Sequence, residues 1–352
     1  MAQPVTIMAV DSVAGKLAVV TGGGSGIGRE LVRQLAAAGC SVAACDLNPD
    51  SVAVIAATAW AAAPPGVTVT GHVCDVSDET QVLRFRDELL EQHASDHVDL
   101  VFSNAGVFGG ASFVNDAREE WERTFAINWG GVYLCARTFL PLLIASGDGV
   151  LVNTSSVAAF WATAGPGATP ISAYSTSNFA IKGFSEALIE DLRVNAPQVR
   201  VVVVMPGVVN TGIAENSRRA LGLPSWEQLS DAELLDLIPE VARAVLVGSG
   251  ELAEDFSADD LRRAIPRLRD MFQDKGFTAA QAAAIILDGV RSGAWRILVG
   301  EEAKLLDEHA RANPLAPWDY NGYAEMYGPL IAQALQDADA DADAPPGDQV
   351  RP

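Results

Sequence analysis

The stretch "KLAVVTGGGSGIGRELVRQL" (residues 16–35) decides the fold of this chain. A short apolar run of the kind found in buried strands comes first, and a helix-length segment follows the glycines. The backbone of "TGGGSGIG" (21–28) can approach a pyrophosphate closely because no side chains block it, and the following helix N-terminus supplies partial positive charge. A strand, a glycine turn and a helix in this order indicate a dinucleotide-binding unit.

An acidic residue lies where such a unit selects its nucleotide. Asp46 ends the second predicted strand in "AACDLN", 18 residues beyond Gly28. A carboxylate at this place accepts both ribose hydroxyls and repels a 2′-phosphate, which favours NAD over NADP. No Arg or Lys occurs between Arg33 and Arg84 to bind that phosphate. The alternative is that Asp46 caps the helix that follows it.

Strand-like and helix-length segments alternate along most of the chain. The predicted strands are 16–20, 41–45, 67–73, 98–103, 149–155, 199–204 and 294–300. The predicted helices include 27–38, 78–92, 118–145, 172–195 and 278–291, the last capped by Thr278. Because the strands are apolar on both faces, we expect an α/β fold, a Rossmann-type doubly wound parallel sheet covered by helices on each side.

Length and composition set the domain organisation. We expect one domain over 1–300 with an enlarged helical lid at 212–277, whose helices lie around 226–247 and 257–274. A helical C-terminal extension (301–336) and an acidic disordered tail (337–352) follow. The net charge of −21 argues against nucleic acid or an anionic membrane as a partner.

The remaining compositional features indicate a cytoplasmic protein. The four cysteines contain no CxxC pair, the N-terminus lacks a secretion signal, and no uninterrupted apolar run approaches membrane-spanning length. His93 and His97 have the spacing of two ligands on one helical face, but no third ligand is near in sequence. We therefore expect no metal site.

Several motifs in a fixed order resemble those of the short-chain dehydrogenase/reductase family over about residues 14–300. They are "TGGGSGIG" (21–28), "CDV" (74–76), "NAG" (104–106), "IN" (127–128), "NTSS" (153–156), Tyr174 and "PGVVNT" (206–211). The resemblance implies an oxidoreductase whose catalytic residues are Asn128, Ser156, Tyr174 and the residue at 178. It also implies a homodimer or homotetramer built through the helices that carry Asn128 and Tyr174.

The resemblance also implies which residues bind the dinucleotide. Asp75 would contact the adenine and Thr211 the nicotinamide amide. The full set is Gly22, Ser25, Gly26, Ile27, Gly28, Asp46, Asp75, Val76, Asn104, Ala105, Gly106, Tyr174, Asn178, Pro206, Gly207, Val209 and Thr211.

The chain departs from the family at the residue one turn after Tyr174. The family has lysine there, which lowers the pKa of the tyrosine and holds the nicotinamide ribose; this chain has Asn178. Lys182 cannot replace it, because eight residues of helix rise about 12 Å and turn some 80° from Tyr174. Asn178 can keep the ribose hydrogen bonds but supplies no positive charge.

A second departure is the longer gap between Ser156 and Tyr174, which contains "AFWATAGPGATP". The family places such a loop beside the substrate pocket, so Phe160 and Trp161 either touch substrate or are ordinary surface or core aromatics. Two interpretations of the predicted lid also remain. Its amphipathic helices could cover a bulky apolar substrate, or they could serve ordinary packing or a subunit contact.

The function predicted from these features is NAD-dependent interconversion of a secondary alcohol and a ketone. The substrate would be bulky and hydrophobic, of aromatic, terpenoid or steroid-like type, because no Arg or Lys cluster marks a charged one. Two alternatives stay open. One is a non-redox activity such as a lyase, an epimerase or a cofactor-binding role, and the other is a deliberate replacement of lysine in an ordinary dehydrogenase.

Overall fold

The computed structural model describes residues 12–110, 112–162, 170–236, 253, 255–264 and 277–315. Its centre is one seven-stranded parallel sheet in the order β3-β2-β1-β4-β5-β6-β7. The strands are β1 (Leu17–Thr21), β2 (Ser41–Asp46), β3 (Val69–Val73), β4 (Leu100–Ser103), β5 (Gly149–Thr154), β6 (Val199–Pro206) and β7 (Arg296–Val299). The predicted fold class and all seven strands are confirmed.

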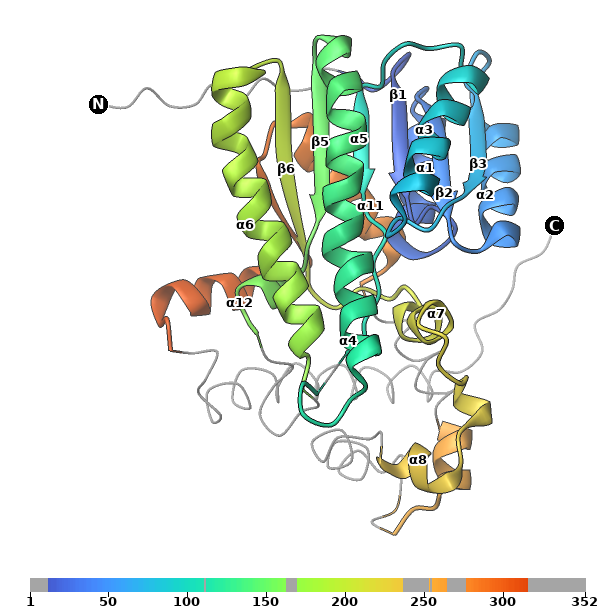
Figure 1. Cartoon of the computed structure of the whole chain (residues 1–352), viewed down its shortest axis with the longest axis vertical. Coiled ribbons are helices and arrows are strands. Elements are labelled where there is room, and N and C mark those ends of the chain that lie inside the picture. The colour runs from blue at the N-terminus through green and yellow to red at the C-terminus, as the bar shows by residue number, and fades with distance from the viewer. Residues whose placement is uncertain are drawn as a thin grey trace, which may run out of the picture.

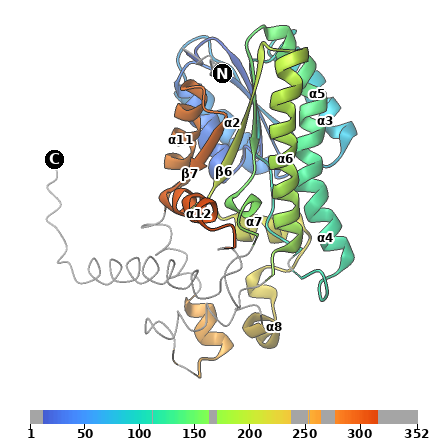
Figure 2. The ribbon, with the colours of Figure 1, turned by 90° about the vertical axis from the view of Figure 1, so that its left-hand side faces the viewer.

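Helices cover both faces of this sheet (Figures 1 and 2). The larger ones are α1 (Gly26–Ala37), α2 (Pro49–Ala62), α3 (Glu79–Gln92), α4 (Arg118–Phe125), α5 (Gly131–Ser146), α6 (Ser172–Asn195), α7 (Ile213–Ala220), α11 (Ala279–Arg291) and α12 (Glu301–Ala312). The shorter ones are the π-helical turn η1 (Ala126–Gly130), η2 (Val157–Ala159), η3 (Trp226–Gln228) and α8 (Asp231–Asp236).

Two hydrophobic layers hold the helices on the sheet. Side chains of α1, α2 and α11, among them Leu31, Ile55 and Ile286, pack against one face. Phe85 of α3 and Phe139 of α5 pack edge to face against each other on the opposite side, where Leu192 of α6 joins them. Because both faces are buried, the central strands are mainly apolar, which is the pattern that predicted a parallel sheet.

The helical stretch from Arg118 to Ser146 combines α4, η1 and α5. By length and composition alone it is long and apolar enough to cross a membrane, and half of its most apolar window is buried inside the fold. It packs against β4 and β5 as a core helix does. The turn at η1 interrupts it at the position of Asn128.

One of the two helices predicted in the lid differs from the structure. The helix expected from residue 226 is broken, because η3 ends at Gln228 and α8 begins at Asp231. Between them Ser230 donates its backbone N–H and hydroxyl to Glu233, so it acts as the start of a new helix. The second lid helix begins at 258 and is described to 264. The rest of the lid, the chain beyond 315 and the predicted acidic tail lie outside the described residues.

Parallel strands bring their carboxyl ends to one edge of the sheet, and the segments that follow them meet there. The glycine loop after β1, Asp46 at the end of β2 and "PGVVNT" after β6 all lie at this edge. Figure 1 shows α7 and α12 below the same edge. Sheets of this kind bind their ligands at this edge.

Candidate active site

A cavity of about 880 Å³ opens at the carboxyl edge of the sheet. It is lined by all four predicted catalytic residues, Asn128, Ser156, Tyr174 and Asn178. Every predicted cofactor-binding residue except Gly28 also lines it. The motifs that are scattered from residue 22 to residue 211 therefore share one site.

Gly28 has a structural place next to that site. A Cβ atom at this position would lie 2.1 Å from the Gly22 carbonyl oxygen, so only glycine lets α1 begin so close to β1. Gly22 and Gly26 have φ values of 66° and 51°, in the region that favours glycine. The loop thus presents backbone rather than side chains to the cavity at the α1 N-terminus, and these residues fit a dinucleotide pyrophosphate.

Asp46 is positioned by the backbone of two loops. Its Oδ2 accepts a hydrogen bond from the Gly24 N–H at 2.9 Å, and its Oδ1 accepts one from the Asn48 N–H at 3.0 Å. The cap of α2 is Asn48, whose side chain accepts from the N–H groups of Asp50 and Ser51. The capping alternative for Asp46 is therefore wrong, and its carboxylate lines the cavity.

Asp75 is held by charge as well as by hydrogen bonds. Its carboxylate accepts from Arg123 at 2.5 Å and from the Ser77 hydroxyl at 2.6 Å. Burial alone would raise the pKa of this carboxyl, but the bonds from Ser77 and Arg123 hold it below its ordinary value. Arg123 thus fixes the orientation of the carboxylate that was predicted to contact the adenine, and sequence reasoning had not identified this partner.

Asn128 projects from the π-helical turn and secures the loop after β4. Its Oδ1 accepts from the Val107 N–H at 2.8 Å, while its Nδ2 donates to the Val107 carbonyl at 3.0 Å and to Ser177 Oγ at 3.2 Å. The side chain is 4 % exposed. It therefore joins three segments, α4–α5, the β4 loop and α6, and the extra residue of the π turn aims it inward.

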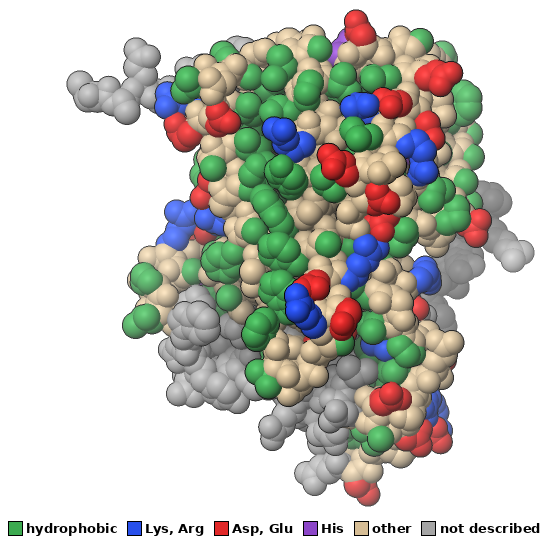
Figure 3. Space-filling view, in the orientation of Figure 1, with side chains coloured by type: hydrophobic (Ala, Val, Ile, Leu, Met, Phe, Trp, Pro, Cys, Tyr) green, Lys and Arg blue, Asp and Glu red, His purple; other side chains and the backbone are tan. Residues whose placement is uncertain are grey.

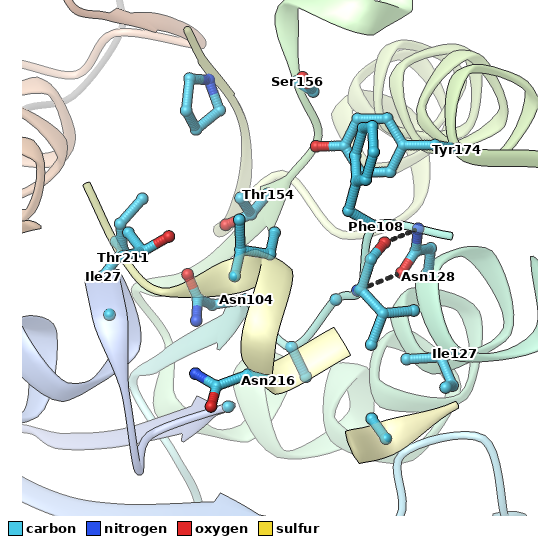
Figure 4. A pocket seen from close by; sticks show the side chains of 18 of the residues that line it. Ile27, Asn104, Phe108, Ile127, Asn128, Thr154, Ser156, Tyr174, Thr211 and Asn216 are labelled. Atoms are coloured by element: carbon cyan, nitrogen blue, oxygen red, sulfur yellow. Dashed lines mark hydrogen bonds between the residues drawn. The ribbon is translucent and has the colours of Figure 1, made fainter. Parts of the chain in front are cut away.

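Tyr174 lies in the first turn of α6 with its hydroxyl directed into the cavity, on the side where Ser156 lies (Figure 4). The ring of Phe108 packs on the tyrosine ring with centroids 4.9 Å apart. Burial raises the pKa of Tyr174, and hydrogen bonds with the Ser156 and Asn178 side chains offset only part of that effect. The phenol is therefore protonated at neutral pH.

Asn178 is buried directly below the tyrosine. Its Nδ2 donates to the backbone carbonyl of Tyr174 at 2.9 Å, and its backbone carbonyl accepts from Ser155 Oγ at 3.0 Å. Lys182 pairs with Glu186 at 2.9 Å and does not line the cavity. The prediction that Lys182 cannot take the family's lysine position is confirmed.

The long loop before α6 contributes one of its two aromatics to the site. Trp161 is 2 % exposed and lines the cavity. Phe160 instead packs under β6, with the Arg296 guanidinium 5.4 Å above its ring. Residues 163–169 of this loop lie outside the described residues.

Some lining residues were missed by sequence reasoning. Glu302 and Leu306 of α12 line the cavity, and Leu306 packs on Trp161. A bidentate ion pair between Arg296 and Asp307, with distances of 2.6 and 3.0 Å, fixes α12 to the sheet. The rule that ligands bind beyond strand carboxyl ends, applied to β7, would have indicated this helix.

The two histidines considered as metal ligands do not face one another. Helix α3 ends at Gln92, so His97 is not on the helix that His93 caps. His93 Nε2 contacts Thr70 and His97 Nδ1 contacts Asp96. Across the described ranges of the chain, no group of three His, Cys, Asp or Glu side chains could hold a metal ion.

Comparison with known proteins shows the family to which this chain belongs. The family model described as short chain dehydrogenase matches residues 16–222. The chain is 32 % identical over 302 residues to the putative oxidoreductase SadH of Mycobacterium tuberculosis, covering 86 % of this chain and 92 % of that protein. It is also 32 % identical over 262 residues to 1-deoxy-11-beta-hydroxypentalenate dehydrogenase of Streptomyces exfoliatus, covering 74 % and 88 %.

Solved structures show the same fold. A short chain dehydrogenase/reductase from Burkholderia phymatum, determined in complex with NAD, superposes with a TM-score of 0.62 at 24 % identity, covering 97 % of this chain and all of that one. Levodione reductase gives a TM-score of 0.60 at 21 % identity, covering 83 % of this chain and 98 % of its own. The chain belongs to the short-chain dehydrogenase/reductase family, and it is an oxidoreductase of that family whose site fits a nicotinamide dinucleotide.

Replacing Asn128 by alanine should lower the free energy of unfolding by about 2–3 kcal/mol, because the Val107 backbone and Ser177 lose buried partners. Urea denaturation followed by circular dichroism measures this loss. Asn195→Ala is the matched control, since Asn195 is exposed and bonds only to Asp191 among described residues. Equal stability of the two variants would contradict the assigned role of Asn128.

Proposed function

We propose that this protein interconverts a secondary alcohol and a ketone on a bulky hydrophobic substrate. The single observation that carries the proposal is the Tyr174 hydroxyl, directed into the cavity beside Ser156 and above the dinucleotide-binding residues. A non-redox binding protein would need neither hydroxyl in that place. Two relatives are named as dehydrogenases of retinol and of a hydroxypentalenate, so each of them takes an alcohol.

Apolar side chains support a hydrophobic substrate. Phe108, Trp161 and Ile171 line the cavity around Tyr174, and Ile213 and Leu306 extend its apolar wall from α7 and α12. Burying such surface against a ligand contributes roughly 25 cal/mol per Å², so a large apolar frame gains more than a small polar one. Glu302 is the one carboxylate that α12 adds to this wall, which disfavours an anionic substrate.

Proton transfer in this site is set by the protonated phenol. When bound, the nicotinamide supplies or accepts the hydride. In the reducing direction Tyr174 donates its hydroxyl proton to the substrate oxygen, which Ser156 positions by hydrogen bonding. In the oxidising direction the Tyr174 oxygen must first lose its proton, and burial disfavours the resulting anion by more than the hydrogen bonds with Ser156 and Asn178 stabilise it. We infer that this chain works better as a reductase at neutral pH.

Asn178→Lys should raise the rate of alcohol oxidation at pH 7 about tenfold or more. The reason is that each unit by which an ammonium group lowers the pKa of Tyr174 raises the tyrosinate fraction about tenfold. Ketone reduction should change much less. The measurement is NADH absorbance in both directions across pH 6–10, with a panel of hydrophobic alcohols and ketones.

The matched control is Lys182→Asn, which removes the lysine one turn further along α6, outside the cavity. Tyr174→Phe should abolish turnover in both directions while leaving dinucleotide binding intact. Retained turnover in Tyr174→Phe would contradict the proposed chemistry, and no gain from Asn178→Lys would show that proton transfer does not depend on an ammonium at this position.

We propose NAD rather than NADP as the cofactor. The Asp46 carboxylate lines the cavity beside the glycine loop, and two backbone hydrogen bonds fix its position. Its negative charge would repel a 2′-phosphate, and none of the cavity-lining residues between Gly22 and Cys74 is a cation.

Asp46→Ala should weaken NADH binding and reduce the preference for NADH over NADPH by about tenfold, because the repulsion and the ribose hydrogen bonds are both lost. Titration of intrinsic fluorescence with each nucleotide measures the two dissociation constants. Asp50→Ala, on the exposed first turn of α2, is the control. Equal affinities for NADH and NADPH in the unaltered protein would refute the selection by Asp46.

We propose a homo-oligomer built on the outer faces of α5 and α6, as the family resemblance implies. Figure 3 shows hydrophobic side chains along this face of the molecule. The exposed apolar residues of α5 and α6 include Tyr133, Ile144 and Phe179, which are 42 %, 38 % and 46 % exposed. A second copy of the chain would bury this stripe.

Tyr133→Glu should shift the protein toward monomers, because the substitution places a charge in the proposed contact. Analytical ultracentrifugation measures the shift. Val54→Glu, at an exposed position on α2, should leave the assembly unchanged. A monomeric starting protein would rule out the oligomer without bearing on the redox chemistry.

A further inference from the structure

Helix α7 contacts both sides of the cavity mouth. On one side Asn216 Nδ2 donates to Ser25 Oγ in the glycine loop at 3.2 Å. On the other side Ser217 Oγ accepts from the Phe108 N–H, beyond β4, at 2.8 Å. Figure 4 shows α7 in front of the site with Asn216 pointing toward the glycine loop. The helix therefore spans the place where a bound dinucleotide would pass.

One face of α7 looks into the cavity. Ile213, Asn216, Arg219 and Ala220 line it, at the three- and four-residue spacing of a single helical face. Arg218 does not line it: its Nε donates to the Pro224 carbonyl at 2.6 Å, and its guanidinium lies 4.7 Å from the Trp226 ring centroid. Two adjacent arginines thus have different surroundings.

The charges of the cavity wall distinguish Arg219 further. The lining includes three carboxylates, those of Asp46, Asp75 and Glu302, and two cations, Arg123 and Arg219. Arg123 is paired with Asp75. Arg219 forms no ion pair with any residue in the described part of the chain. A pyrophosphate carries two negative charges, and it would enter a chain whose net charge is already −21.

We propose that Arg219 binds the pyrophosphate of the dinucleotide from the α7 side, opposite the glycine loop. This inference rests on the proposed use of a nicotinamide dinucleotide. The position of Asn216 favours the pyrophosphate over a 2′-phosphate. It lies three residues before Arg219 on the same helical face and contacts Ser25, beside the α1 N-terminus where the pyrophosphate would lie. A guanidinium and a phosphate form short, charge-assisted hydrogen bonds.

The test compares Arg219→Gln with Arg218→Gln, which remove the same charge from adjacent positions of one helix. Dissociation constants are measured by calorimetry for NADH and NADPH, for ADP-ribose, which contains the pyrophosphate, and for adenosine, which does not. Arg219→Gln should weaken NADH and ADP-ribose about tenfold and leave adenosine unchanged. Arg218→Gln should leave all three unchanged. The loss for ADP-ribose should shrink as salt is raised from 50 to about 500 mM, because salt screens the ion pair.

Three results would overturn the inference. One is an equal effect of the two arginine substitutions, which would indicate a general charge effect. Another is a loss of adenosine affinity matching that of ADP-ribose, which would indicate damage to the fold. The third is a larger loss for NADPH than for NADH, which would assign Arg219 to the 2′-phosphate. Failure of the unaltered protein to bind NADH would instead refute the proposed cofactor.

Discussion

The structure depends on the close approach of α1 to the end of β1. A Cβ atom added at position 28 would lie 2.1 Å from the Gly22 carbonyl oxygen, so any residue other than glycine would push the helix away from the sheet. That approach puts the α1 N-terminus at the cavity and exposes loop backbone to it. Asp46 is fixed by the same loop through the Gly24 N–H. Backbone packing thus shapes the dinucleotide site before any side chain contributes.

The chemistry of the site is determined by what surrounds one phenol. Burial raises the pKa of Tyr174, and no ammonium group lies one turn later in α6 to oppose that effect. Here Asn178 supplies only dipoles, and its Nδ2 already donates to the Tyr174 carbonyl. A neutral phenol is a proton donor, which is the basis for our proposal that this chain favours reduction.

The substrate side of the site is assembled from elements distant in sequence. Trp161 comes from the long loop after β5, Ile213 from α7, and Leu306 from the helix after β7. The buried Arg296–Asp307 ion pair holds that last helix in place, and the guanidinium also covers the Phe160 ring. The segment beyond the last strand is therefore part of the active site rather than an appendage.

The sequence by itself determined the sheet, the order of its motifs and a set of site residues of which all but Gly28 line the cavity, because strand periodicity and glycine spacing are local properties. It also showed that Lys182 could not reach the tyrosine, since helix geometry is fixed. Only the tertiary structure decided the partners: Arg123 for Asp75, Val107 for Asn128, and α12 for the cavity wall. Those contacts join residues that are 21 to 94 positions apart in the sequence. No local sequence pattern shows which distant side chain will make such a contact.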